Sequence, residues 1–81
     1  MSLLDTSLFS VANTSEPELK RILKEIAETL ELENYQAVDQ IVGYLLTGEP
    51  IYITSKNDAR HKIRSLDRSK VLHQLVKAYL E

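Results

Sequence analysis

The chain has no cysteine, so it can form neither a disulfide nor a thiolate metal site. No apolar run approaches the roughly 20 residues of a membrane-spanning helix, and the amino terminus lacks the basic and apolar regions of a signal peptide. His61 and His73 are far apart, and no pair of carboxylates at ligand or catalytic spacing accompanies them. We therefore expect a soluble cytoplasmic protein with surface histidines, no membrane insertion, no metal, no cofactor and no enzymatic activity.

The chain is also short and nearly neutral. Its 81 residues suffice for one small domain, and a domain of this size buries only about 60% of the surface that its unfolded chain exposes. We therefore expect association with another chain to supplement the core. The formal net charge of −2 conceals an asymmetry, because residues 1–54 carry a net −6 whereas residues 55–70 carry +4. This distribution predicts one basic surface on an otherwise acidic molecule.

Two amphipathic helices are indicated in the first part of the chain. Ser15 and Glu18 form a capping box with Pro17 in the first turn, so the first helix is expected to begin there and to end near residue 32. A second helix is expected over residues 37–47, and its apolar side chains share one face that we expect to be buried. These side chains are Val38, Ile41, Val42, Leu45 and Leu46.

Glycine and proline are scarce, with two of each, and three of these four residues lie within or just after the second helix. Gly43 lies inside the helix, which indicates the close approach of another helix. Gly48 can adopt the left-handed conformation after the last turn, and Pro50 prevents the helix from continuing. The β-branched and aromatic residues 51–54 then predict a short extended connector rather than a sheet.

The last third of the chain predicts two more helices. Ser55 or Asn57 can cap a third helix with a thin apolar face, and Asp67 or Ser69 can cap a fourth helix with an uninterrupted apolar stripe. The stripe consists of Val71, Leu72, Leu75, Val76, Tyr79 and Leu80. The predicted fold class is therefore all-α: a flexible amino-terminal segment over residues 1–15, then a compact four-helix domain over residues 16–81 with a short extended connector after its second helix.

Arg60, Arg64 and Arg68 are the main candidates for a binding site. They are four residues apart, so a continuous helix would place three guanidinium groups in one row, and such groups bind carboxylates and phosphates with paired donors. A structural role would leave each arginine solvated or paired with an acidic residue of the first helix. The functional alternatives are a docking surface for a protein, a receptor for a phosphorylated residue, or a nucleic-acid patch on a basic helix over residues 57–68. The acidic remainder of the chain argues against nucleic acid.

A second candidate site lies near the amino terminus. Thr6 and Ser7 are two hydroxyl groups that a kinase could modify, and the apolar Leu8 and Phe9 follow them. A phosphate would add about −1.5 to −2 charges, enough to direct this segment towards or away from a group of arginines.

An ordered set of residues runs through the chain from about residue 19 to residue 80. It consists of Tyr35, residues 40–46 (QIVGYLL), Gly48, residues 50–53 (PIYI), Ala59, Arg60, Ile63, Arg64, Arg68 and residues 75–80 (LVKAYL). Together these residues resemble the IreB family of small regulatory proteins from Gram-positive bacteria. The amino terminus resembles that family more weakly, through its pattern of Asp5, Thr6, Ser7, Leu8 and Phe9.

The resemblance implies a cytoplasmic, homodimeric, all-α regulator that acts with a PASTA-type Ser/Thr kinase and its cognate phosphatase. It places Ser7 at the phosphoacceptor position, where the family usually has threonine, with Thr6 as the neighbouring alternative, and it maps the regulatory arginines onto Arg60, Arg64 and Arg68. In some members the unphosphorylated form promotes Clp-dependent degradation of the enolpyruvyl transferase that begins peptidoglycan synthesis. The implied function is control of cell-envelope synthesis through protein partners, and a small nucleic-acid-binding module is the alternative.

Overall fold

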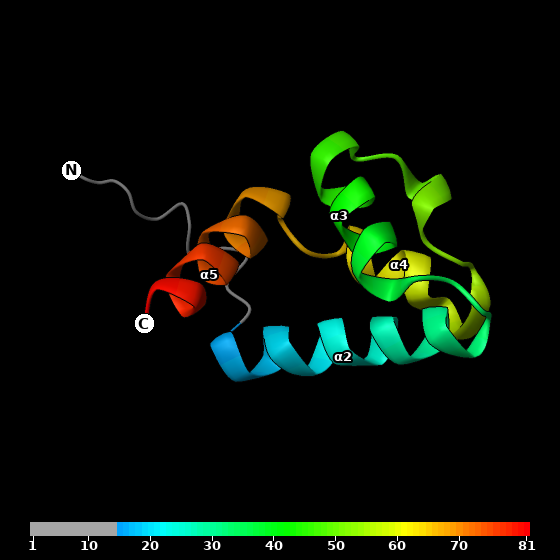
Figure 1. Ribbon diagram of the computed structural model, residues 1–81, viewed down its shortest axis with the longest axis horizontal. Coiled ribbons are helices and arrows are strands. Elements are labelled where there is room, and N and C mark those ends of the chain that lie inside the picture. The colour runs from blue at the N-terminus through cyan, green and yellow to red at the C-terminus, as the bar shows by residue number, and fades with distance from the viewer. Residues whose placement is uncertain (1–14) are drawn as a thin grey trace.

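The computed structural model describes residues 15–81, and this part of the chain is helical, with no strand. Its elements are α2 (Glu16–Leu32), α3 (Ala37–Thr47), the 3₁₀ turns η1 (Pro50–Tyr52) and η2 (Lys56–Asp58), α4 (Ala59–Arg64) and α5 (Arg68–Leu80). Helices α3 and α4 pack on α2, whereas α5 stands apart at one end (Figure 1). The predicted all-α class is confirmed. Thr6 and Ser7 lie outside the described residues.

Local capping groups fix the start of α2, the end of α3 and the start of α5 where the sequence predicts them. The Ser15 hydroxyl accepts a hydrogen bond from the Glu18 amide (3.3 Å), and the Asp67 carboxylate accepts one from the Ser69 amide (2.9 Å). Gly48 has a φ of 74°, and its amide donates to the carbonyl of Tyr44 (2.7 Å). The predicted bounds of the first two helices and the Asp67 cap of the last are therefore confirmed.

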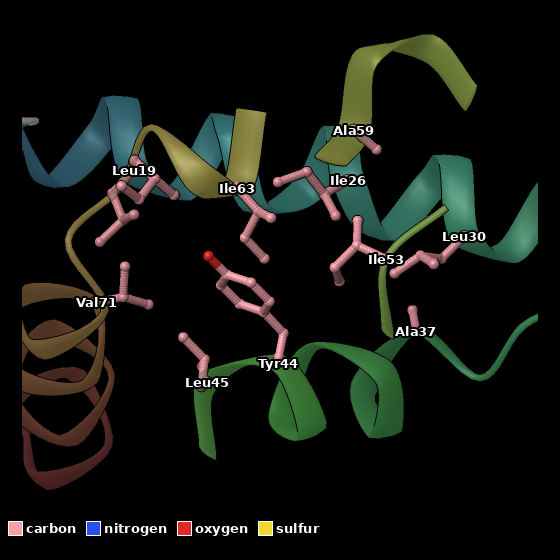
Figure 2. Close-up of a cluster of buried hydrophobic side chains, with 11 residues drawn as sticks. Leu19, Ile26, Leu30, Ala37, Tyr44, Leu45, Ile53, Ala59, Ile63 and Val71 are labelled. Atoms are coloured by element: carbon pink, nitrogen blue, oxygen red, sulfur yellow. The ribbon is translucent and has the colours of Figure 1, made fainter. Parts of the chain in front are cut away.

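One hydrophobic core lies between α2, α3 and α4. Ile26 and Leu30 of α2, Ile53 of the connector and Ile63 of α4 are almost completely buried, and Figure 2 shows their side chains converging. The ring of Tyr44 points from α3 into the same space. The connector is thus part of the core, because Ile53 fills the space between helices that are far apart in sequence.

The predicted buried face of α3 was wrong for the single chain. Leu45 is buried, but Val38 and Leu46 are 74% and 76% exposed and Val42 is also exposed. The helix buries the face that carries Ala37, Tyr44 and Leu45. These residues also have helical spacing, and the large Tyr44 ring fills the core better than a valine would. A line of three apolar side chains therefore remains on the outer face of α3.

Gly43 permits a close approach, although not by another helix as the sequence suggested. A Cβ at this position would lie 2.6 Å from Cδ1 and Cε1 of the Tyr52 ring. Tyr52 belongs to η1, so the predicted extended connector begins with a 3₁₀ turn and becomes extended only at Ile53 (φ −117°, ψ 130°). The main-chain carbonyl of Tyr52 accepts a hydrogen bond from Nε2 of Gln40 (2.8 Å), which holds the turn on α3.

The third helix is much shorter than predicted. Asn57 and Asp58 have positive φ values of 50° and 61°, so the α-helical turns begin only at Ala59, and neither Ser55 nor Asn57 caps them with its side chain. The helix ends at Arg64, and a new helix begins at Arg68. The single row of three guanidinium groups, which needs one continuous helix, does not form.

The last helix leaves nearly all of its apolar stripe uncovered. Val71 is its one buried residue, whereas Tyr79 and Leu80 are 92% and 79% exposed. Leu72, Leu75 and Val76 are also exposed. The helix is therefore attached to the core at its first turn and projects away from it (Figure 1).

Candidate interaction surface

Arg60 is anchored to the connector that enters the core. It is the second residue of α4, and its Nε donates a hydrogen bond to the main-chain carbonyl of Ile53 (3.0 Å). Ile53 is fully buried, so this bond holds the connector against the first turn of α4. A guanidinium carries five N–H donors, and within residues 15–81 the four donors on the terminal nitrogens of Arg60 form no hydrogen bond.

Arg68 joins the start of α5 to the end of α3. Its Nη1 donates to the main-chain carbonyl of Leu45 (3.2 Å), and its guanidinium carbon lies 2.9 Å from where a Cβ on Gly48 would be. The last turn of α3 has no basic residue of its own. Arg68 therefore supplies from another helix the positive charge and donor that stabilise a helix carboxyl end.

Arg64 differs from the other two arginines. It is the last residue of α4, its side chain is exposed, and it forms no hydrogen bond or ion pair with the rest of residues 15–81. The structure therefore gives different roles to three residues that the sequence grouped together. Two of them bond to main-chain carbonyls, whereas the Arg64 guanidinium forms no hydrogen bond or ion pair within residues 15–81.

An ion pair between an acidic residue of α2 and Arg60, Arg64 or Arg68 was one expectation from the sequence. In the structure, Glu25 of α2 pairs with two other basic residues. Glu25 forms ion pairs with Arg21 of the same helix (3.0 Å) and with Lys62 of α4 (3.4 Å). The hydrogen bond from Arg21 and the nearby Lys62 lower the pKa of Glu25 below its usual value of 4.5. No periodic signal in the sequence predicts the Glu25–Lys62 pair, because it joins residues 37 positions apart through tertiary packing.

Both histidines are exposed, as predicted. Within residues 15–81, no three histidine, cysteine or carboxylate side chains gather into a group that could hold a metal ion. None of the helices in the same range has the length and apolar content to cross a bilayer.

These features define a class: a small helical protein with basic side chains in the last turn of α4 and exposed apolar side chains along α3 and α5. The model of a family described as "IreB regulatory phosphoprotein" matches residues 5–81. A "UPF0297 protein" of Ruminiclostridium cellulolyticum is 40% identical over 81 residues, which is the whole of this chain and 92% of the relative. The chain belongs to the IreB family, and the resemblance found in its sequence is confirmed.

Proposed function

We propose that this protein is a non-enzymatic regulatory adaptor whose amino-terminal segment is phosphorylated at Thr6 or Ser7 by a PASTA-type Ser/Thr kinase and dephosphorylated by the cognate phosphatase. The observation that carries the proposal is the family match, which begins at Asp5 and so includes both hydroxyl groups. The description of that family as regulatory phosphoproteins supports the same assignment. We place the adaptor in the cytoplasm as a homodimer.

We infer that the surface carrying Arg60 and Arg64 of α4 and Arg68 of α5 engages the partner. Arg64 contributes an exposed guanidinium, and Arg60 and Arg68 contribute the donors that their main-chain bonds leave over. The matching partner surface is acidic, because guanidinium groups pair with carboxylates through two parallel hydrogen bonds. Phosphorylation of Thr6 or Ser7 then acts electrostatically, since the phosphate competes for these arginines or repels the acidic partner.

The output is control of cell-envelope synthesis. In the unphosphorylated state the adaptor presents an enolpyruvyl transferase of peptidoglycan synthesis to Clp-dependent proteolysis, and phosphorylation relieves that restraint. The support for this step is the family membership, together with a surface suited to protein partners rather than to a small substrate.

The phosphorylation step is tested by intact-mass and fragment mass spectrometry after incubation with a PASTA-type kinase domain from the same organism. We expect one added phosphate on Thr6 or Ser7, lost in the Thr6→Ala/Ser7→Ala double variant and retained in one of the single variants. Absence of phosphate from residues 1–14 would overturn the kinase assignment.

The arginine surface is tested by Arg64→Ala against Lys77→Ala, which removes the same charge from an exposed position on α5. We expect Arg64→Ala to slow turnover of the enolpyruvyl transferase in cells while the thermal unfolding midpoint stays unchanged, because the exposed Arg64 side chain forms no hydrogen bond or ion pair within residues 15–81. Lys77→Ala should change neither. Equal turnover in the two variants would mean that the partner binds elsewhere.

A further inference from the structure

A shallow hollow on α2 gathers the basic side chains of that helix. It is lined by Pro17, Lys20, Arg21, Lys24, Glu25 and Glu28. Its three cations are the only basic residues in the first 54 positions of the chain, which also hold nine acidic residues. The hollow is therefore the one concentration of positive charge in the acidic part of the sequence.

Two of these cations have no partner in the described part of the chain. Lys20 and Lys24 are exposed, and neither side chain forms a hydrogen bond or ion pair within residues 15–81. They are four residues apart on one helix, so they lie on the same face, where like charges repel each other. An anion bound between the two ammonium groups would remove that repulsion and would accept hydrogen bonds from both.

The carboxylates of the hollow do not cancel its positive charge. Glu25 is already paired with Arg21 (3.0 Å) and with Lys62 of α4 (3.4 Å). Glu28 forms no ion pair within residues 15–81. With Lys62 beside it, the hollow has four cations and two carboxylates, so an anion is the ligand that its charge favours.

The chain that precedes α2 is long enough to reach this hollow. Ser7 is eight residues before Ser15, which allows an extended distance of up to about 26 Å. Lys24 is nine residues after Ser15, roughly 13 Å along the helix. Residues 1–14 carry one acidic side chain, Asp5, and no basic one, and a phosphate on Thr6 or Ser7 would add about −1.5 to −2 charges. Both the length and the charge of this segment therefore fit the hollow.

We propose that a phosphate on Thr6 or Ser7 binds between Lys20 and Lys24 of the same chain, so that α2 is the receptor for the phosphorylated amino-terminal segment. This inference rests on the phosphorylation in the proposed function and names the groups that receive the phosphate. The segment of the same chain is the favoured occupant, because a short tether gives an effective concentration on the order of millimolar.

The position of the hollow also favours one of the two electrostatic routes. Lys62 of α4 pairs with Glu25 of the hollow, so a phosphate bound there lies beside α4. It adds negative charge next to the surface of Arg60 and Arg64 without occupying their guanidinium groups. The phosphate then repels an acidic partner instead of competing with it for the arginines.

The test uses full chains in which the phosphate is installed during synthesis, on Ser7 in one chain and on Thr6 in another, so that no kinase is needed. Phosphorus NMR follows the second ionisation of the phosphate, whose ordinary pKa is about 6. Nearby ammonium groups favour the dianion and lower this pKa. We expect the titration midpoint to lie roughly half a pH unit lower in at least one of these chains than in the same chain with Lys20→Ala/Lys24→Ala.

Matched variants separate a specific receptor from total charge. Lys20→Arg/Lys24→Arg should keep the low midpoint, because both positive charges remain. Lys56→Ala/Lys77→Ala removes two charges from exposed positions outside α2 and should keep it as well. Far-UV ellipticity should not change in the alanine pair on α2, since both lysines are exposed. If ellipticity is lost, Lys20→Gln/Lys24→Gln replaces that pair.

Three results would overturn the proposal. The first is an unchanged midpoint when Lys20 and Lys24 are replaced, in both phosphorylated chains. The second is a midpoint raised by Arg64→Ala and not by the pair on α2, which would place the phosphate on α4. The third is recovery of the low midpoint when unphosphorylated wild type is added to the phosphorylated Lys20→Ala/Lys24→Ala chain, which would place the receptor on a second copy.

The kinase assignment is judged separately, by mass spectrometry of unmodified wild type after incubation with the kinase domain. A low midpoint in a chain with installed phosphate, together with no phosphorylation by the kinase, would support the receptor and overturn the kinase assignment. Phosphorylation by the kinase, together with a midpoint that does not depend on Lys20 and Lys24, would do the reverse.

Discussion

Replacement of Gly43 by alanine sets two effects of opposite sign against each other. Alanine favours the interior of α3 by about 1 kcal/mol relative to glycine. The new Cβ, however, would lie 2.6 Å from two carbons of the Tyr52 ring, well inside van der Waals contact. That ring cannot withdraw cheaply, because the Tyr52 carbonyl is bonded to Gln40 and the next residue, Ile53, is fully buried.

Overpacking of this kind costs about 1–3 kcal/mol, which outweighs the helical preference of alanine. Gly43→Ala should therefore lower the free energy of unfolding, by up to about 2 kcal/mol. The sign should reverse in a Tyr52→Ala background, where the ring is gone and the helical preference of about 1 kcal/mol remains. The coupling between the two positions should therefore be about 1–3 kcal/mol.

Urea unfolding followed by ellipticity at 222 nm measures the free energy of unfolding of the wild type, the two single variants and the double variant. The protein concentration is kept the same throughout, because association would add to the apparent free energy of unfolding. Additive substitutions, with Gly43→Ala stabilising in both backgrounds, would refute the reasoning. Such a result would mean that η1 moves freely on α3 and that the glycine is merely tolerated.

Other perturbations probe the remaining contacts that hold the fold. Ile53→Ala should lower the free energy of unfolding by about 2–5 kcal/mol, because it leaves a cavity in the centre of the core; a loss below 1 kcal/mol by urea unfolding would contradict that placement. Arg68→Ala should cost about 1–2 kcal/mol through the lost bond to Leu45, and Arg68→Lys should recover part of it in the same assay. The pKa of Glu25 is lower in the folded chain than its usual value of 4.5, so the ionised carboxylate stabilises the fold at pH values above 4.5. This contribution is lost as the pH falls through the pKa of the folded chain. Glu25→Gln should thus lower the unfolding midpoint slightly at neutral pH and not at pH 2, and an equal difference at both pH values would contradict the ion pairs.

Both ends of α2 and α3 and the start of α5 could be predicted because they depend on neighbouring residues. Ser15 and Asp67 cap the helices that follow them, and Gly48 ends α3 in the left-handed conformation. Each of these signals operates over a few residues, so the packing of the rest of the chain is not needed to read it. The all-α class follows from the same local information.

The arginine surface could not be predicted in its correct form, because it depends on two backbone conformations that the sequence does not mark. Asn57 and Asp58 both have positive φ, and they delay α4 until Ala59. The spacing of the three arginines was therefore regular in sequence but not in space. The anchoring of Arg60 and Arg68 to main-chain carbonyls is a tertiary contact, which spacing cannot reveal.

The incorrect prediction of the buried face of α3 has a different origin. Periodicity showed that Val38, Val42 and Leu46 share an apolar face, and that observation is sound. Periodicity does not indicate whether the surface that covers this face belongs to the same chain. Here the chain covers the neighbouring face, with Tyr44 and Leu45, and leaves this line exposed beside an equally exposed α5. An amphipathic pattern therefore identifies an apolar face but not the surface that covers it, and Val38, Val42 and Leu46 remain exposed where residues 15–81 fold alone.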